Sequence, residues 1–187
     1  MRARTTLKPS LLKSKEWRFC HAIDLRRRCQ EAIGPNYFGN AVAIGTAEPL
    51  SVDEILGANG LSLAASSIRY SIDHMDSLTS FRNMTGLDAK LRPEERVLLR
   101  AWGLPETSFL LTSWYSLNAA YWDFGIGCPI IFRAGDGPVL NFGTLFPDCQ
   151  KQQKYDLHFC LPEKEHELLM KDEEFRSWFQ PYGLMRQ

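Results

Sequence analysis

The stretch "YWDFGIGCP", residues 121–129, places a single carboxylate among aromatic side chains. Asp123 lies between Trp122 and Phe124, and these neighbours predict that its carboxylate is buried. A buried charge is costly unless a cation and hydrogen bonds compensate for it. The stretch "AIDLRRRC" supplies candidates, because a strand would place Arg26 and Arg28 on one face. We therefore predict an ion pair between Asp123 and Arg26 or Arg28.

Two glycines follow this carboxylate. Gly125 or Gly127 is expected to adopt a positive φ angle or to allow a close backbone approach, since glycine does so at little steric cost. The segment therefore predicts a tight turn directly after Asp123.

Histidine is the usual general base in proteins, and a base must lie close to the proton that it removes. The chain has four histidines. His21 falls in a predicted strand and His74 on the polar face of a predicted helix, and we expect neither to be catalytic. A Cys/His or Ser/His nucleophile within the chain stays open, although no nucleophile elbow supports one.

The helices and strands that must position these residues belong to a chain of 187 residues, of which 44% are hydrophobic. This length and composition are sufficient for one well-packed domain. Basic and acidic residues number 22 each, which discounts binding to nucleic acid or to an anionic membrane. No apolar run is long enough to span a bilayer. The five cysteines form no C-x-x-C pair, which argues against a metal site or a disulfide framework and favours reduced thiols in the cytoplasm.

Residues 1–15 are a basic segment with five basic residues and no acid. Pro9 interrupts the amphipathic helix that a mitochondrial presequence needs, so a frayed terminus or the edge of a larger domain is the favoured interpretation. The folded domain is expected to cover residues 16–187.

Hydrophobic periodicity predicts a mixed order of elements. Ser51 and Glu54 have the spacing of a capping box, and apolar residues then recur at helical spacing from Leu61 to Phe81. Residues 86–96 are expected to form a loop and a short helix, and residues 162–180 a charged helix. Strands are predicted at 16–25, 39–47, 108–114, 128–133, 138–146 and 155–161. This order favours an α+β fold with helices packed on a largely antiparallel or mixed sheet.

Several stretches, in matching order, resemble motifs of the plant and fungal BAHD acyltransferases. "DFGIG" with Pro129 is similar to the family's D-F-G-W-G-K-P, with Ile126 in place of tryptophan and Cys128 in place of lysine. "IDLRRR" at 23–28 resembles V-D-x-R-x-R, "PNYFGNAV" at 35–42 resembles P-x-x-Y-x-G-N, and "TSW" at 112–114 resembles the T-S-W of hydroxycinnamoyl transferases. The tail "LMKDEEFRSWFQPYG" at 169–183 resembles fungal members, including the trichothecene acetyltransferase group.

The resemblance covers residues 16–183 and implies a chloramphenicol-acetyltransferase-like fold. Two similar domains of such an enzyme flank a channel in which acyl-CoA, as cosubstrate rather than bound cofactor, meets a small-molecule alcohol. This chain resembles the second, C-terminal half only. The catalytic histidine of the family lies in an H-x-x-x-D-G motif of the first half, and none of the four histidines here begins that motif.

The resemblance also implies roles for single residues. Thr112 and Trp114 would help to stabilise the oxyanion of acyl transfer, and Ser113 would contact acyl-CoA. Structural roles fall to Asp123, Arg26, Arg28, Gly125, Gly127 and Asn40. The residues taken alone favour another interpretation of "FLLTSW", an ordinary buried strand with Trp114 filling the core.

Three hypotheses follow for the function. The chain is expected to be the C-terminal part of an acyl-CoA-dependent O-acyltransferase that acts on a fungal secondary-metabolite alcohol and takes its catalytic histidine from an absent first half. One alternative is an inactive, truncated relative. The other is an interaction module that pairs with the first domain or with a full-length relative through its uncovered apolar surface. We expect the isolated chain to be inactive, because it lacks a visible general base.

Overall fold

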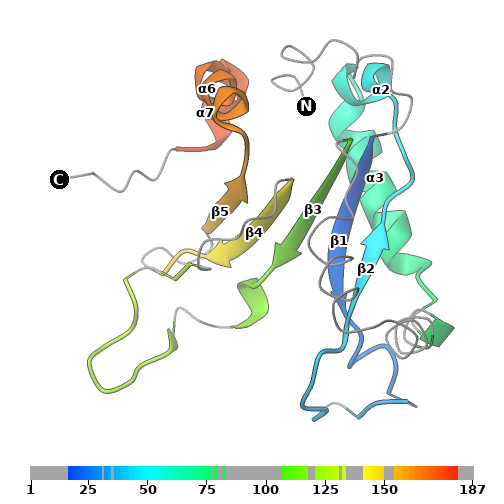
Figure 1. The fold of residues 1–187 in the computed structure, drawn as a ribbon, viewed down its shortest axis with the longest axis vertical. Helices are drawn as coiled ribbons and strands as arrows, with labels where there is room; N and C mark the ends of the chain where they lie inside the picture. Colours follow the sequence, from blue (N-terminus) through cyan, green and yellow to red (C-terminus); the bar gives the residue numbers. More distant parts are fainter. Residues whose placement is uncertain are drawn as a thin grey trace.

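A mixed five-stranded sheet, in the order β2-β1-β3-β4-β5, forms the centre of the protein (Figure 1). The computed structural model describes residues 17–30, 32–34, 36–76, 78–79, 82, 107–117, 121–130, 132–133, 141–149 and 154–180. The strands are β1 (Arg18–Asp24), β2 (Val42–Thr46), β3 (Ser108–Ser113), β4 (Phe142–Pro147) and β5 (Tyr155–Cys160). The helices are α2 (Val52–Leu56), α3 (Gly60–Asp73), the 3-10 turn η2 (Tyr115–Leu117), α6 (Glu163–Lys171) and α7 (Glu173–Trp178).

The middle of the sheet is parallel and its edges are antiparallel. Strand β3 pairs in parallel with β1 on one side and with β4 on the other. Strands β2 and β5 pair antiparallel with β1 and β4. The expected α+β class with a mixed sheet and flanking helices is therefore confirmed.

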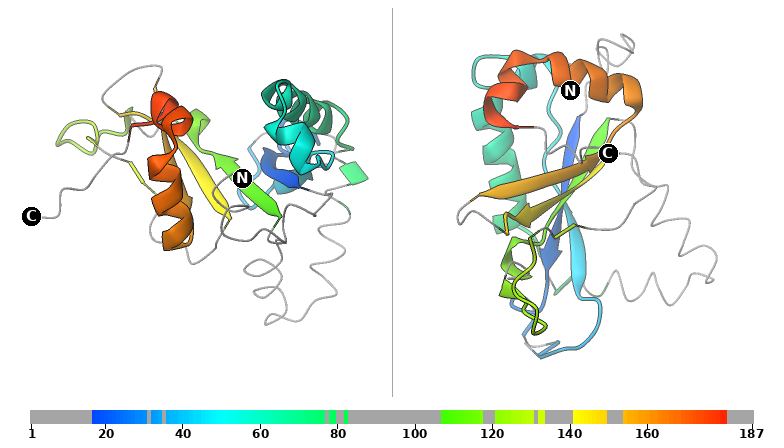
Figure 2. Two further views of the ribbon diagram at one scale, coloured as in Figure 1. Left: turned by 90° about the horizontal axis from the view of Figure 1, so that it is seen from above. Right: turned by 90° about the vertical axis from the view of Figure 1, so that its left-hand side faces the viewer.

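The described helices cover one face of the sheet. Phe19 of β1, Phe109 of β3 and Phe159 of β5 face the same space as residues of α2, α3, α6 and α7. Figure 2 shows the helices as two separate groups, α2 with α3 and α6 with α7. Because side chains alternate along a strand, residues an odd number of positions from these, such as Thr112 three positions after Phe109, lie on the other face. We call this second face the helix-free face, since none of the described helices packs on it.

Local signals in the sequence fix several helix ends. The predicted capping box is present, because the Ser51 hydroxyl accepts from the Glu54 backbone N–H while the Glu54 carboxylate accepts from the Ser51 backbone N–H. At the other end of the chain, the Asp172 carboxylate caps α7 by accepting from the Phe175 backbone N–H at 3.0 Å. The helix expected at 162–180 is therefore two helices that meet at Asp172.

Two other predicted elements differ from the structure. Helix α3 ends at Asp73 instead of near Phe81, because the Asp76 carboxylate accepts from the Thr79 backbone N–H at 2.9 Å and begins a separate turn. No strand forms in the described part of 128–133, where Pro129 has no N–H to give to a sheet and Ile130 is 69% exposed. The loop and short helix expected at 86–96 and the basic segment 1–15 lie outside the described residues.

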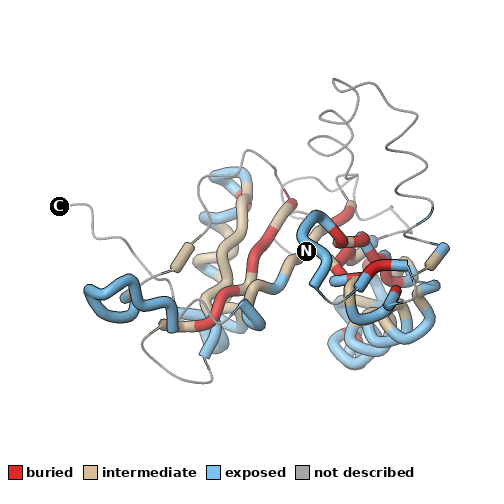
Figure 3. The backbone as a smooth tube through the Cα atoms, turned by 90° about the horizontal axis from the view of Figure 1, so that it is seen from below, coloured by how far each residue is buried: buried red, intermediate tan, exposed pale blue. Residues whose placement is uncertain are grey.

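Buried residues gather in two places along the sheet (Figure 3). One cluster joins β1, the loop after it and β2 to α3, and it contains Ile23, Leu25, Cys29, Ile33, Ala41 and Ala43 with Ile72 and Met75 packed against it. The other lies at β4, where Phe146 is completely buried. Strand β3 lies between these two places and carries the "TSW" stretch.

Candidate functional site

Thr112 and Ser113 end strand β3 and project to opposite faces of the sheet. Thr112 is half-buried on the helix-free face, whereas Ser113 is exposed on the helix-bearing side. Trp114 follows directly, and its backbone N–H donates to the Leu145 carbonyl at 2.8 Å, which keeps it beside β4. The structure therefore brings Thr112 and Trp114 to one face and separates Ser113 from them.

Trp114 is held by an aromatic cluster on the helix-free face. Its ring meets Phe146 edge-on, with centroids 5.5 Å apart, and lies 6.2 Å from Phe132. Phe132 in turn contacts Phe146 at 5.5 Å and Trp122 at 5.4 Å, both edge-on. Such edge-to-face pairs are favourable and directional. Trp114 thus has the core contacts that the sequence alone favoured, and these contacts fix its position two residues after Thr112.

Asp123 is exposed, and its carboxylate organises the glycine turn. One carboxylate oxygen, Oδ1, accepts from the backbone N–H of Gly125 at 2.7 Å and of Gly127 at 3.0 Å. Both glycines have positive φ angles, 91° and 96°, as expected for this turn. The neighbouring Trp122 connects the turn to the aromatic cluster through Phe132. Asp123 therefore fixes the turn next to Trp122, and Trp122 contacts Phe132, which packs on Trp114.

The predicted burial of Asp123 and its ion pair with Arg26 or Arg28 are wrong. Arg26 pairs instead with Asp24 at 3.0 Å and donates to the carbonyls of Tyr37 and Gly39. Arg28 donates to the Ile72 carbonyl at 2.9 Å and so ties the loop after β1 to α3. Local backbone carbonyls and Asp24 satisfy these cations, so neither needs Asp123. Asn40 is exposed in the loop before β2.

Substitution of Asp123 should therefore have a modest effect. Asp123→Ala removes the acceptor of two backbone N–H groups, and we expect the free energy of unfolding to fall by about 1 kcal/mol, the usual worth of such bonds at the surface. Asp123→Asn keeps an oxygen at Oδ1 and should stay within about 0.5 kcal/mol of the parent. Urea denaturation measures both. A loss of about 3 kcal/mol or more would instead indicate a buried ion pair.

His21 forms a Ser/His pair with Ser71, but the geometry does not suit catalysis. His21 is buried, and its Nε2 lies 2.7 Å from the Ser71 Oγ. The Ser71 hydroxyl donates its only proton to the Ile68 carbonyl at 2.9 Å. The imidazole must therefore be the donor to Ser71, and it has no lone pair directed at that hydroxyl. This pair joins β1 to α3 and is not an activated nucleophile.

The burial of His21 predicts that the free energy of unfolding depends on pH. Burial lowers the pKa of His21 from its ordinary 6.5, and the Arg28 guanidinium lowers the pKa further. Below about pH 6.5 the unfolded chain binds a proton that the folded protein does not, so the free energy of unfolding should decrease until pH passes the lowered pKa. Urea denaturation at pH 7.5 and about 5.5 measures this decrease. The decrease between the two pH values should be smaller in His21→Gln than in the parent. An equal decrease in the variant and the parent would contradict this prediction.

The other histidines do not supply an obvious base either. His74 is exposed at the end of α3, where its Nδ1 donates to the Tyr70 carbonyl at 3.0 Å. His166 is exposed on α6. His158 is half-buried on β5 and lies on the helix-free face, opposite Thr144 of β4. Among the described residues, no group of His, Cys, Asp and Glu could hold a metal ion.

Sequence reasoning missed two polar residues on the same face as Thr112. Thr144 is the register partner of Thr112 across β3 and β4, and His158 is the partner of Thr144 across β4 and β5. All three share the helix-free face. Alternation along each strand could have assigned their faces, but only strand pairing places them side by side.

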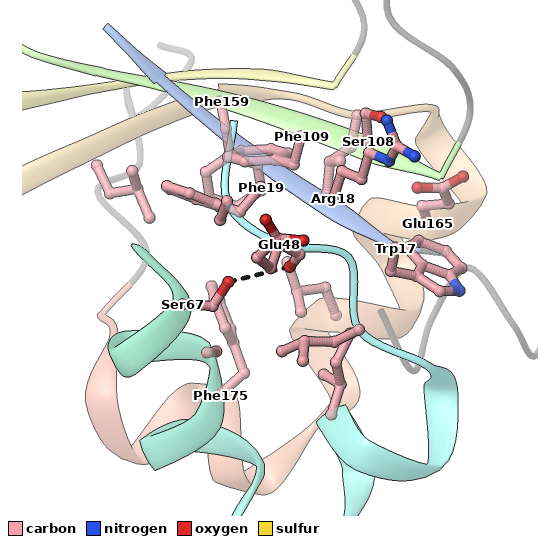
Figure 4. A pocket seen from close by; sticks show the side chains of 17 residues that line it. Trp17, Arg18, Phe19, Glu48, Ser67, Ser108, Phe109, Phe159, Glu165 and Phe175 are labelled. Atoms are coloured by element: carbon pink, nitrogen blue, oxygen red, sulfur yellow. Dashed lines mark hydrogen bonds between the residues drawn. The ribbon is translucent and has the colours of Figure 1, made fainter. Parts of the chain in front are cut away.

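An apolar cavity of about 350 Å³ lies on the opposite, helix-bearing face (Figure 4). Its walls come from both helix groups and from the sheet, where Phe19 and Phe109 stack at 6.3 Å. The Ser67 hydroxyl donates to the Glu48 carbonyl at 3.0 Å along one wall. None of the site residues expected from the sequence lines this cavity.

Comparison with known proteins places these features in a family. The model of the Transferase family matches residues 4–176. Phenolic glucoside malonyltransferase 1 of Bemisia tabaci is 39% identical over 75 residues, which make up 38% of this chain and 16% of that protein.

No described helix is both long and apolar enough to cross a membrane.

Solved structures share the fold at low sequence identity. TRI101 of F. sporotrichioides, in complex with coenzyme A and T-2, has a TM-score of 0.70 and 22% identity over 94% of this chain and 40% of its own length. Vinorine synthase has a TM-score of 0.64 and 19% identity over 92% of this chain and 37% of its own. The chain thus spans about two fifths of these proteins. It belongs to the Transferase family and has the chloramphenicol-acetyltransferase-like fold of the BAHD-type acyltransferases.

Proposed function

We propose that this chain is the C-terminal part of an acyl-CoA-dependent O-acyltransferase. The supporting observation is the position of Thr112 and Trp114, which share the helix-free face at the end of the central parallel strand. Membership in the Transferase family and the coenzyme A held by TRI101 structures are consistent with this role. The acyl-CoA is a cosubstrate in this proposal, not a bound cofactor.

In the proposed reaction, the acceptor's hydroxyl oxygen attacks the thioester carbonyl carbon while a general base removes the hydroxyl proton. The carbonyl oxygen becomes an oxyanion, and the Thr112 hydroxyl donates a hydrogen bond to it. Trp114 shapes the adjoining wall and offers its indole N–H as a second donor. Collapse of the tetrahedral intermediate breaks the carbon–sulfur bond, forms the ester and releases the thiol of coenzyme A, which takes up the proton.

The general base is proposed to come from a separate first domain. Neither His21 nor His74 has suitable geometry, and no histidine begins an H-x-x-x-D-G motif. A partner domain also has an apolar surface to contact, because the turn segment exposes Phe124 by 84%, Ile126 by 94% and Ile130 by 69%. Large apolar side chains that are exposed together mark interaction sites. The same segment would serve the alternative function of an inactive interaction module.

The acceptor is proposed to be a small-molecule alcohol. TRI101 structures hold T-2 or deoxynivalenol, and the Bemisia tabaci relative is named for a phenolic glucoside and a malonyl group. We propose acetyl or a related acyl group, a secondary-metabolite acceptor and a place in the fungal branch of the family. The free cysteines of the described chain are consistent with a cytoplasmic protein.

A reconstitution experiment tests the proposed function. The purified chain is incubated with radiolabelled acetyl-CoA and a panel of alcohols, alone and fused behind the first domain of a full-length relative. We expect transfer by the fusion only, because the chain alone lacks the base. Turnover by the chain alone that disappears on replacement of one of its histidines would place the base within it. A folded fusion that transfers no acyl group would leave the interaction module as the better hypothesis.

A further inference from the structure

Strand β5 forms one edge of the sheet. It pairs with β4 on one side, and none of the described strands pairs with its other side (Figure 1). The Asp148 backbone N–H donates to the Lys154 carbonyl at 3.0 Å, so the pair that begins this ladder is hydrogen-bonded. Backbone groups alternate in direction along an antiparallel strand. The residues whose N–H and C=O groups point to the open edge are therefore Tyr155, Leu157 and Phe159.

A groove of about 770 Å³ follows this edge. All five residues from Tyr155 to Phe159 line it, although successive side chains point to opposite faces of the sheet. A groove can meet all five only if it runs along the edge of the strand. Trp178 and Phe179, at the end of α7, line it as well and are 78% and 42% exposed. Exposed rings beside an open strand edge are typical of an interaction site.

The sequence of β5 is complementary to a second, antiparallel copy of itself. In a symmetric pairing about Leu157, Asp156 lies opposite the partner's His158 and Tyr155 lies opposite the partner's Phe159. Opposite-charge and aromatic pairs across two strands are favourable. The Asp–His pairs fall at non-hydrogen-bonded positions, because the backbone groups of Asp156 and His158 point to β4. Side chains approach each other more closely at these positions.

Other symmetric pairings fit less well. Pairing about Asp156 would set two carboxylates opposite each other, and pairing about His158 would do the same with two imidazoles. Like charges directly opposite each other are destabilising. The other edge strand, β2, has the sequence VAIGT and carries no charged side chain. Charge therefore favours one edge of the sheet and one register.

Asp156 is in an unfavourable environment within a single chain. Burial raises the pKa of its carboxyl group, and the Asp148 carboxylate raises this pKa further. The Arg133 guanidinium lowers the pKa of Asp156 but offsets only part of the increase. An imidazole keeps at least one N–H donor in either charge state. A second imidazole beside Asp156 would therefore stabilise the charged carboxylate.

We propose that two copies of the chain associate by antiparallel pairing of their β5 strands, which joins the two sheets into one. The outward backbone groups of Leu157 bond to the partner's Leu157, and those of Tyr155 bond to the partner's Phe159. Asp156 accepts a hydrogen bond from the partner's His158 on each side of the symmetry axis. This dimer is independent of the proposed acyl transfer, so either proposal can fail without the other.

Sedimentation velocity of the purified chain over a series of concentrations tests the pairing. We expect the parent to change from monomer to dimer as concentration rises. His158→Asp sets two carboxylates opposite each other, and Asp156→His sets two imidazoles opposite each other. Each variant should raise the Kd of the dimer about tenfold, because symmetry changes two pairs at once. A 1:1 mixture of the two variants should regain the parent's affinity, since Asp and His then face each other at both positions.

Proline variants test the backbone pairing. Leu157→Pro removes an N–H that points to the open edge, where edge strands tolerate proline, so the variant should fold and stay monomeric. Ile44→Pro is the matched control, because the Ile44 N–H also points away from the neighbouring strand, at the opposite edge. It should dimerise like the parent. Far-UV circular dichroism checks the fold, and if Leu157→Pro does not fold, the mixture of charge variants decides.

The exposed glycine turn needs its own control. Ile126 is 94% exposed there, and Ile126→Ser should leave the Kd of the dimer unchanged. Loss of the dimer in Ile126→Ser would place the interface at the turn and overturn the pairing of β5. A parent that is monomeric at every concentration, a folded Leu157→Pro that dimerises like the parent, or a mixture that regains no affinity would overturn it as well.

Discussion

Thr112→Val is expected to lower kcat of the active fusion by on the order of 10²-fold, the usual loss for one oxyanion donor. Valine keeps the shape of the strand residue and deletes only the hydroxyl. The lost hydrogen bond forms to charge that develops in the transition state, so kcat should fall more than KM for acyl-CoA rises. Steady-state kinetics with varied acyl-CoA separates the two parameters.

Thr112→Ser is the matched control, since it retains the hydroxyl and should keep most of the activity. Trp114→Phe is a less clean test, because Trp114 also packs on Phe146 and Phe132. A kcat for Thr112→Val within about threefold of the parent, in a folded protein, corresponds to less than about 0.7 kcal/mol. That result would make "TSW" a core strand with no part in catalysis.

Phe146→Ala is expected to lower the free energy of unfolding by about 3–5 kcal/mol. Phe146 is completely buried and lies at the centre of the aromatic cluster, in contact with Trp114 and Phe132. Truncation removes the buried ring and leaves a cavity beside Trp114, two positions after Thr112. Urea denaturation of the chain, followed by far-UV circular dichroism, measures the loss.

Phe124→Ala is a suitable control, because the same side-chain type is 84% exposed there and the change should stay within about 0.5 kcal/mol. A loss below about 1 kcal/mol for Phe146→Ala would mean that the cluster does not hold β3 and β4 together. If the variant does not fold, Phe146→Leu gives a smaller cavity and preserves the comparison.

The sequence predicts elements well where a local pattern decides them. The capping box at Ser51 follows from two side chains three residues apart, β1 from an alternation along the strand and β5 from a short apolar run. Sequence also indicates the turn at Gly125 and Gly127, since positive φ angles favour glycine. The helix ends at Asp73 and Lys171 are harder to predict, because the acids that follow, Asp76 and Asp172, could either continue the helix or cap the next turn.

The burial of a side chain and the register between strands depend on segments distant in sequence, so local patterns predict them less well. Aromatic neighbours suggested a buried Asp123, yet Phe124 is exposed and the carboxylate bonds to its own loop. Thr144 and His158 carry no local motif, and they reach Thr112 only through the pairing of β3, β4 and β5. The catalytic assignments of Thr112, Ser113 and Trp114 stay predictions, although the structure shows that Ser113 faces away from the other two.

The parallel pairing of β1 with β3 also has a consequence for how the chain folds. Arg18 is aligned with Ser108, so this contact closes a loop of about half the chain, whereas β4 and β5 are joined by a short connection. Contacts that are distant in sequence slow folding, because the entropy of loop closure is lost before the contact is gained. The β4–β5 pair can form early, whereas the β1–β3 pair has to form late. On a ribosome, β1 would therefore have to wait for β3 with one edge unpaired, which is a state prone to aggregation.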